Sequence, residues 1–323
     1  MKRETRQKLI GWGLRALGPA ILIVLIARLD RPADLLEAAK RVAPWPLALA
    51  VALNAIPLWL KVLRWQLILR ARGIRYGTRD AWLAFSASLY LGMLTPGRVG
   101  DVLRIRYLRH DTGARYAEGL ASVVLDRLAD LYVLVGFVAA AVAHWGGVLS
   151  PRLALVSWLL VASCVALPLV LMVPGTSDAV LTRLYRRVAR EPEADGMAVF
   201  LESLRTSAKR SALPMLVTTL AAFSVNFLQG KLLADAMGLH LSIFDVVSLQ
   251  SVQSLLGLMP ISVSGLGVRE AFYAAVFPGL GHTAEQGASY GLLVFLVMYV
   301  AQVVIGAVAW QLRPPPVGAV KTA

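Results

Sequence analysis

Long apolar runs separated by clusters of basic residues are the feature that most limits how this chain can fold. Apolar residues make up 58% of its 323 residues, and the mean hydropathy is +0.66. Soluble domains are usually about 45–50% apolar, so this composition needs a solvent other than water. Several runs approach the ~20 residues that a helix needs to cross ~30 Å of hydrocarbon. The pattern therefore predicts an all-α polytopic membrane protein.

The basic residues predict the orientation of the chain. Lys and Arg number 33 against 19 Asp and Glu, a formal net charge of +14. A nucleic-acid-binding domain would interleave such residues with an amphipathic fold, whereas here they cluster between apolar runs, as cytoplasmic loops do. We expect both termini in the cytoplasm, a bacterial-type inner membrane and no nucleic-acid partner. The densest predicted loop carries Lys61, Arg64, Arg70, Arg72, Arg75 and Arg79.

Metal and thiol chemistry have little support in the sequence. The single cysteine, Cys164, lies inside an apolar run, and the four histidines are scattered without metal-ligand spacing. The longest polar stretch, residues 175–211, is far shorter than a soluble catalytic domain. We therefore expect no metal, no cofactor and no catalytic residue, and the sequence favours a function other than enzymatic catalysis.

Two apolar segments are too short to cross simply. Residues 81–95 end at Pro96 and Gly97, and residues 246–259 end at Pro260 and a glycine-rich stretch. If residues 81–95 crossed, the basic stretch behind them would face outside, whereas a helix that breaks and returns satisfies both length and charge. Broken backbone at membrane depth needs protein or a water-filled cavity beside it. We predict about six transmembrane helices plus two re-entrant helical hairpins, with eight simple spans as the alternative. The six expected spans are residues 11–29, 44–63, 117–145, 153–173, 213–237 and 287–310.

The two short segments also match each other at a constant offset, since 238 − 73 = 165. The matching pairs are Gly73/Gly238, Asp80/Asp245, Ser86/Ser251, Gly92/Gly257, Gly100/Gly265 and Arg104/Arg269. Because the two hairpins would enter from opposite sides, the halves would form an inverted repeat, as in many secondary transporters. We expect one integral membrane domain over residues 1–323, with repeats at about 44–173 and 213–312 and a cytoplasmic loop at 175–211.

Four ionisable residues are expected at membrane depth. Asp126, Arg127 and Asp130 lie within reach of one another on the helix that begins near residue 117. Lys231 lies buried in the middle of the 213–237 span and needs an acid, for which the candidates are Asp126, Asp130, Asp235 and Glu270. A charge near the bilayer centre costs at least ~2.5–3.5 kcal/mol. The four residues therefore indicate either an ion-paired structural cluster or part of a polar pathway.

The hairpins carry the candidate head-group site. After the first break come Arg98, Asp101 and Arg104, and the second hairpin carries Arg269 and Glu270. A helix that restarts after glycines points free N–H groups at an anion, and arginine can bind phosphate through two hydrogen bonds. We expect these residues to bind a lipid phosphate or head group. For the first hairpin, the alternative is a basic edge whose arginines reach anionic lipid at the surface.

Three sequence blocks resemble the signature blocks of the lysylphosphatidylglycerol-synthase transmembrane region, a flippase-like integral membrane family. They are LYLGMLTPGRVGDVLRIRYL (89–108), ASVVLDRLADLY (121–132) and LLGLMPISVSGLGVREAFY (255–273), and LKVLRWQLILRARG (60–73) fits the family's basic loop. The resemblance covers residues 14–312. Asp101 and Asp126 stand where the family more often has Glu, which preserves the charge.

The resemblance implies movement of aminoacylated or glycosylated phospholipids between leaflets. The leading hypothesis is a flippase-like transporter of an anionic or polyisoprenoid-linked lipid. In other members the same region is fused to a glycosyl- or aminoacyl-transferase domain, which no segment here fits. The alternatives are an intramembrane transferase with Asp126 or Glu270 as base, and a non-catalytic partner of a separately encoded transferase.

Overall fold

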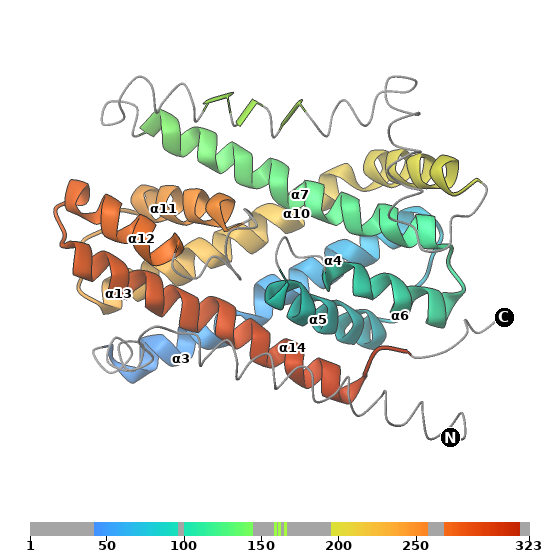
Figure 1. Cartoon of the computed structure of the whole chain (residues 1–323), viewed down its shortest axis with the longest axis horizontal. Helices are drawn as coiled ribbons and strands as arrows, with labels where there is room; N and C mark the ends of the chain where they lie inside the picture. Colours follow the sequence, from blue (N-terminus) through green and yellow to red (C-terminus); the bar gives the residue numbers. More distant parts are fainter. Residues whose placement is uncertain are drawn as a thin grey trace.

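The computed structural model describes residues 42–95, 100–144, 195–257 and 268–316, and the isolated positions 158, 159, 161, 162, 165 and 166. Every regular element in these ranges is helical (Figure 1). The expected first span (11–29), Arg98, the tips of both hairpins and most of the span at 153–173 lie outside them. All the isolated positions are helical.

Within the described ranges, three helical segments are long and apolar enough to cross a membrane. The first joins α3 (Pro44–Leu53) to α4 (Ala55–Ala71), the second is α10 (Gly196–Ala236), and the third runs through α13 (Ala284–Val294), the π-helix η4 (Phe295–Val300) and α14 (Ala301–Leu312). The first bends at Asn54, because Pro57 has no N–H for the carbonyl of residue 53. The Asn54 side-chain amide donates to the Val297 carbonyl of η4 at 2.8 Å, which ties this position to the third segment.

The helix α5 (Thr78–Leu94) is followed by a reversal of the chain into α6 (Leu103–Thr112). The Gly100 N–H donates to Thr95 Oγ1 at 2.9 Å, so residue 100 lies back beside the end of α5. At the other end, Arg313 donates to Asp80 at 2.9 Å and to Asp111 at 2.6 Å. The chain therefore enters and leaves this first hairpin at the same end.

The second hairpin is built from α11 (Ile243–Leu256) and α12 (Val268–Val276). A capping box between Ser242 and Asp245 begins α11. Val246 of α11 packs in one apolar cluster with Tyr273 of α12 and with Phe277, which follows α12. The start of α11 thus lies beside the end of α12, as in the first hairpin.

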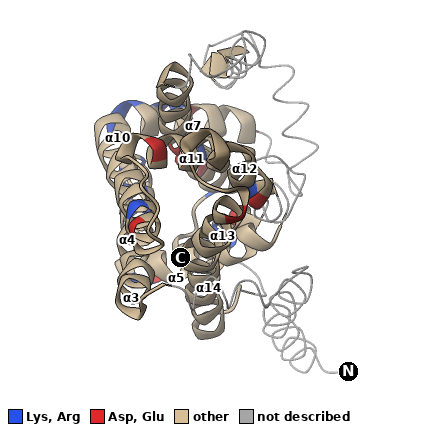
Figure 2. Ribbon diagram, turned by 90° about the vertical axis from the view of Figure 1, so that its left-hand side faces the viewer, with Lys and Arg blue, Asp and Glu red and all other residues tan. Residues whose placement is uncertain are grey.

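Each of the two hairpins packs on a helix from the other half of the chain. The first hairpin packs through α5 on α14, and the second packs through α11 on α7 (Tyr116–His144), while α4 packs on α10. A Cβ at Gly306 of α14 would lie 2.7 Å from the Ser86 carbonyl oxygen, so glycine permits the close approach of α14 to α5. Viewed end-on, α3, α4 and α10 form one side of the molecule and α12, α13 and α14 the other (Figure 2).

Two helices are longer than the sequence predicts. The helix α4 continues past residue 63 to Ala71, so part of the predicted basic loop is helical. The helix α10 begins at Gly196, inside the stretch 175–211 that was assigned to a cytoplasmic loop. The first turns of α10 are amphipathic, because Leu201 and Leu204 are buried whereas Glu202 between them is exposed. Glu202 forms an ion pair with Arg72, the residue that follows α4, at 2.9 Å.

Candidate functional site

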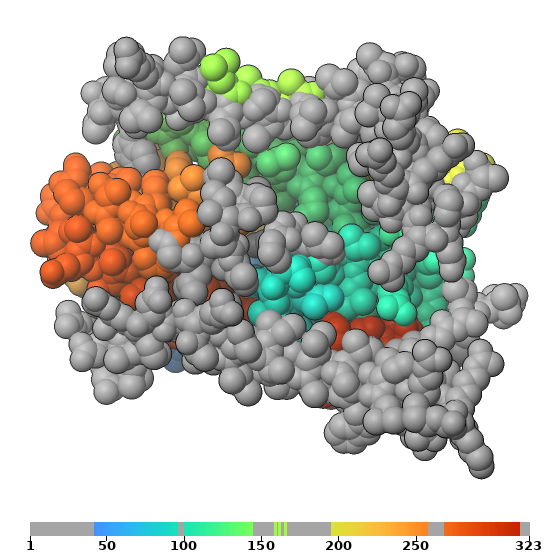
Figure 3. Space-filling model, in the orientation of Figure 1, coloured from blue at the N-terminus to red at the C-terminus, as the bar shows by residue number. Residues whose placement is uncertain are grey.

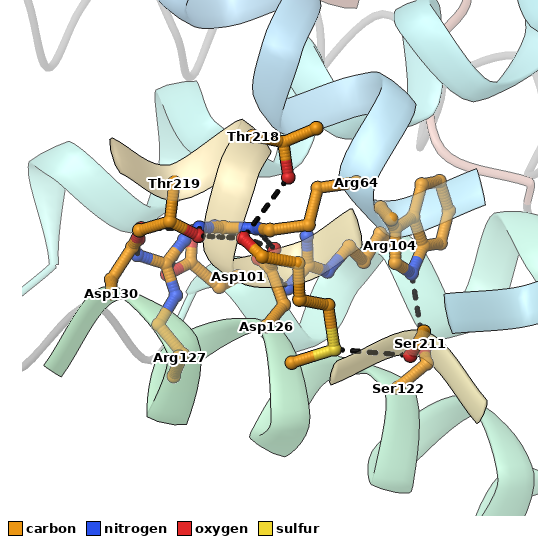
Figure 4. Close-up of polar contacts among 12 residues, drawn as sticks. Arg64, Asp101, Arg104, Ser122, Asp126, Arg127, Asp130, Ser211, Thr218 and Thr219 are labelled. Atoms are coloured by element: carbon orange, nitrogen blue, oxygen red, sulfur yellow. Dashed lines mark hydrogen bonds and ion pairs between the residues drawn. The ribbon is translucent and has the colours of Figure 1, made fainter. Parts of the chain in front are cut away.

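Arg64 of α4 lies at the centre of a buried ion-pair cluster (Figure 4). Its Nε donates to Asp126 Oδ1 at 2.8 Å and its Nη1 to Asp130 Oδ1 at 2.7 Å. Asp126 and Asp130 are one turn apart on α7, so a single guanidinium reaches both. The same Nη1 donates to Thr219 Oγ1 at 2.7 Å, so the cluster joins α4, α7 and α10.

Arg104 connects the first hairpin to this cluster. It is fully buried, and its Nη2 donates to Asp126 Oδ2 at 2.8 Å. Its guanidinium lies 5.2 Å from the ring centre of Trp65 and 4.8 Å from that of Phe85, within the range of cation–π attraction. Asp126 therefore accepts from two arginines on two different elements.

Arg127 completes the cluster on the side of the hairpin turn. Its Nη2 lies 2.9 Å from Asp101 Oδ2, and its Nη1 lies 3.5 Å from Asp130 Oδ2. Asp101 in turn packs against Gly92, where a Cβ would lie 2.3 Å from Asp101 Oδ1. The pair between Arg127 and Asp101 thus holds the returning arm of the hairpin against α5 and α7.

The expected site residues separate into three groups in the structure. Asp101, Arg104, Asp126, Arg127 and Asp130 come together in the cluster, and Arg98 lies outside the described residues. Arg269 and Glu270 begin α12, in the second hairpin. Arg269 is buried, and its guanidinium lies 4.0 Å from the ring centre of Tyr299.

Lys231 does not join the cluster. It forms an ion pair with Asp235, one turn further along α10, and its side chain is 31% exposed. Its partner lies on the same helix, so Lys231 is not part of the charged cluster that was expected to include it. Asp235, one of the acids considered from the sequence, is its partner.

Arg64 is the central residue that the sequence analysis missed, because it was assigned to the basic loop after residue 63. The run around it, LKVLRWQLIL, stays apolar on both sides. That continuity indicates a helix that continues past Arg64, and a buried arginine on such a helix needs carboxylates from elsewhere in the fold.

A cavity of about 260 Å³ lies beside the cluster, between the two hairpins. Its walls include the C-terminal ends of α5 and α11, so both members of the pair Gly92/Gly257 line it. On the face shown in Figure 3, α5 and α6 (cyan) and the segment from α11 to α13 (orange) occupy separate halves of the molecule. Other lining residues are Met93, Thr95, Gln250, Gln253, Ser254, Phe223, Asn226, Phe227, Tyr299 and Gln302.

The charged wall of the cavity carries Lys61, Arg127 and Asp130. Within the cluster, the three arginines Arg64, Arg104 and Arg127 balance the three aspartates Asp101, Asp126 and Asp130. Lys61 adds one further positive charge at the wall. A cation in a site shielded from bulk water interacts strongly with an anion, so this arrangement suits a negatively charged group such as phosphate.

These features define a helical integral membrane protein in which the ends of α5 and α11 and a buried ion-pair cluster border a cavity lined by both polar and apolar side chains. The chain belongs to the family of the lysylphosphatidylglycerol synthase TM region, whose model matches residues 15–306.

Two relatives are described as UPF0104 membrane proteins. One, from Methanothermobacter thermautotrophicus, is 25% identical over 333 residues, which cover 95% of this chain and 93% of the relative. The other, from Methanocaldococcus jannaschii, is 22% identical over 231 residues, which cover 69% of this chain and 94% of the relative.

Proposed function

We propose that this protein is a flippase-like transporter that moves an anionic or polyisoprenoid-linked lipid between the leaflets of the cell membrane. The observation that carries the proposal is the cavity between the two hairpins, whose wall presents Lys61 and Arg127 against the single carboxylate of Asp130. A lipid that changes leaflet must carry its charged phosphate through the hydrocarbon, and a protein cation on the route offsets the cost of losing water.

An inverted repeat over residues 44–173 and 213–312 is part of the proposal. The helices α5 and α11 begin at residues 78 and 243, which are 165 apart (243 − 78). Gly73 and Gly238 both have positive φ, at 79° and 70°, after helices that end at residues 71 and 236.

The way in which the hairpins pack on the other helices supports the same repeat. Each hairpin packs on the long helix of the opposite half, α5 on α14 and α11 on α7. That exchange is expected of two halves related by a pseudo-two-fold axis. We therefore place six spans and two re-entrant hairpins in an inner membrane, with both termini cytoplasmic.

The proposed roles of the site residues follow from their contacts. Lys61 and Arg127 line the cavity and contact the phosphate. For Arg98, which lies outside the described residues, the same role is proposed from the sequence alone. Asp101 and Arg104 are positioning residues, since their ion pairs hold the first hairpin on α7. We assign Arg269 and Glu270 the corresponding place in the second hairpin.

The transferase alternative places a base at Asp126 or Glu270. Asp126 is fully buried between Arg64 and Arg104, an arrangement that suits a structural ion pair better than proton transfer. Lipid mass spectrometry of a deletion strain separates the two functions, because loss of a transferase removes a lipid species and loss of a flippase only misplaces it. The third function, a non-catalytic partner of a separate glycosyl- or aminoacyl-transferase, requires co-purification with that enzyme.

Leaflet-resolved lipid movement in proteoliposomes tests the proposal. Lys61→Gln removes the excess positive charge of the wall, and we expect it to slow the movement of an anionic phospholipid at least about tenfold. Lys231→Gln is the matched control, because Lys231 is paired with Asp235 and is not among the residues that line the cavity. If Lys61→Gln moves lipid as fast as Lys231→Gln, the proposed phosphate route is wrong.

A further inference from the structure

Neutral hydrogen-bonding side chains line much of the cavity beyond its charged wall. They come from α10, α11 and α14. The residues are Asn226, Gln250, Gln253, Ser254 and Gln302. Carboxamides and hydroxyls both donate and accept hydrogen bonds, so this part of the cavity is matched to a neutral polar group.

Some of these side chains form no hydrogen bond, or only a long one, within the part of the chain that the structure describes. Among the residues that the structure describes, the side chains of Asn226 and Ser254 form no hydrogen bond, although both line the cavity. Gln302 donates only a long bond of 3.3 Å to Asn54 Oδ1, and Gln253 one of 3.4 Å to the Tyr299 hydroxyl. A hydroxylated ligand would supply hydrogen-bond partners for these groups, which favours its binding there.

The charged wall disfavours an ammonium group. Within the described lining, Asp130 is the one carboxylate, and it already accepts from Arg64 at 2.7 Å and from Arg127 at 3.5 Å. An ammonium-bearing head group would therefore meet Lys61 and Arg127 without an available acid. Like charges repel strongly where water is excluded.

We propose that the transported lipid carries a small, uncharged, hydroxylated head group on its phosphate, and that aminoacylated lipids are poor substrates. The phosphate lies against Lys61 and Arg127, and the head-group hydroxyls bond to Asn226 and Ser254. A cavity of about 260 Å³ is at the small end of ligand sites, which run from about 300 to 1,000 Å³, so it suits a glycerol or a single hexose. The inference rests on the proposed transport function.

Transport of four lipids by the full chain tests the inference in phosphatidylcholine proteoliposomes. The first two, phosphatidylglycerol and a polyprenyl phosphohexose, represent the two sources of the proposed chemistry. The third, lysylphosphatidylglycerol, adds ammonium groups, and the fourth, phosphatidic acid, lacks the head group. We expect at least one of the first two to move about tenfold or more faster than the lysyl lipid, and about threefold or more faster than phosphatidic acid.

The outcomes separate this inference from the function on which it rests. If none of the four lipids moves faster than in empty vesicles, the transport function fails. If the lysyl lipid moves as fast as the hydroxylated lipids, transport stands and the head-group inference is wrong. Equal rates for phosphatidic acid and the hydroxylated lipids also contradict it, because the head group would then not be recognised.

Two variants locate the recognition in the cavity. Asn226→Leu and Ser254→Ala each remove hydrogen-bonding capacity, and we expect each to slow the preferred hydroxylated lipid about threefold to tenfold. Phosphatidic acid should keep its rate, which shows that the variant is folded. Ser224→Ala, at an exposed position of the same helix as Asn226, is the control and should change neither rate. Equal slowing of both lipids by Asn226→Leu or Ser254→Ala would contradict the assignment.

Discussion

Arg64 and Asp126 lie 62 residues apart in the sequence, yet Arg64 Nε is 2.8 Å from Asp126 Oδ1 in the interior of the helix bundle. This contact joins the first candidate span to the helix that also receives Arg104 from the first hairpin. It therefore connects the stability of the bundle to the position of the hairpin beside the cavity.

Arg64→Met should strongly destabilise the folded protein. It takes one partner from each of the buried carboxylates of Asp126 and Asp130. Removing one side of a buried ion pair costs about 3–5 kcal/mol, and we expect the lower end because Arg104 and Arg127 remain as partners. Thermal unfolding in detergent measures the loss.

Lys231→Met is the control for this substitution, since its pair with Asp235 is partly exposed and surface substitutions change stability by about 0.5 kcal/mol or less.

In a double-mutant cycle, Arg64→Met and Asp126→Asn should be less than additive by about 0.5–3 kcal/mol. Equal unfolding temperatures for Arg64→Met and Lys231→Met would show that the cluster adds nothing to stability.

Gly100→Ala should displace the returning arm of the first hairpin. A Cβ at residue 100 would lie 2.3 Å from the Leu91 carbonyl carbon, which belongs to backbone and cannot rotate away. Overpacking of this kind costs about 1–3 kcal/mol, and we expect lower thermal stability together with slower lipid movement. Gly136→Ala, on α7, is the matched control because an added Cβ there meets no atom within 4 Å. If both alanine variants behave alike, the close approach of residue 100 to α5 is not required.

The junction of Arg313 with the ends of the first hairpin should be sensitive to acid. Burial raises the pKa of the Asp111 carboxyl group, but hydrogen bonds to it outweigh burial and bring the pKa below its usual value. The donors are His110, Tyr76 and Arg313. A carboxylate with a lowered pKa stabilises the fold above its unfolded-state pKa, and that contribution is lost as the pH falls through the folded-state value.

We therefore expect thermal stability to fall as the pH drops below about 4, near the ordinary pKa of aspartate. Asp111→Asn should lower stability at neutral pH and flatten this acid dependence. An unchanged acid profile in Asp111→Asn would assign the sensitivity to other carboxylates.

The sequence predicts the helices of this fold better than it predicts their contacts. The start of α7 and the break after Thr95 follow from apolar runs, glycine and proline, which act locally. The burial of Arg64 depends on carboxylates supplied by α7, and a cationic position after an apolar run resembles a loop until that partner is known.

The candidate site was also only partly predictable. Asp126, Arg127 and Asp130 share one helix, so their proximity follows from helical spacing. Lys231 was expected to join them, but the point along α10 that meets the cluster is a property of packing between helices. That point is Thr219, and Lys231 lies about three turns further along, where it pairs with Asp235. Gly92 and Gly257, which the sequence pairs at an offset of 165, both line the cavity, and the repeat that this pairing suggests stays a prediction.

A reversible cross-link across the cavity tests the transport route most directly. Met93→Cys on α5 and Ser254→Cys on α11 place thiols on its two hairpin walls, in a chain whose single cysteine is removed by Cys164→Ala. We predict that a reducible bis-thiosulfonate cross-linker stops the movement of an anionic lipid in proteoliposomes, and that dithiothreitol restores it. Unchanged lipid movement in fully cross-linked protein would contradict passage of the lipid head group between the two hairpins.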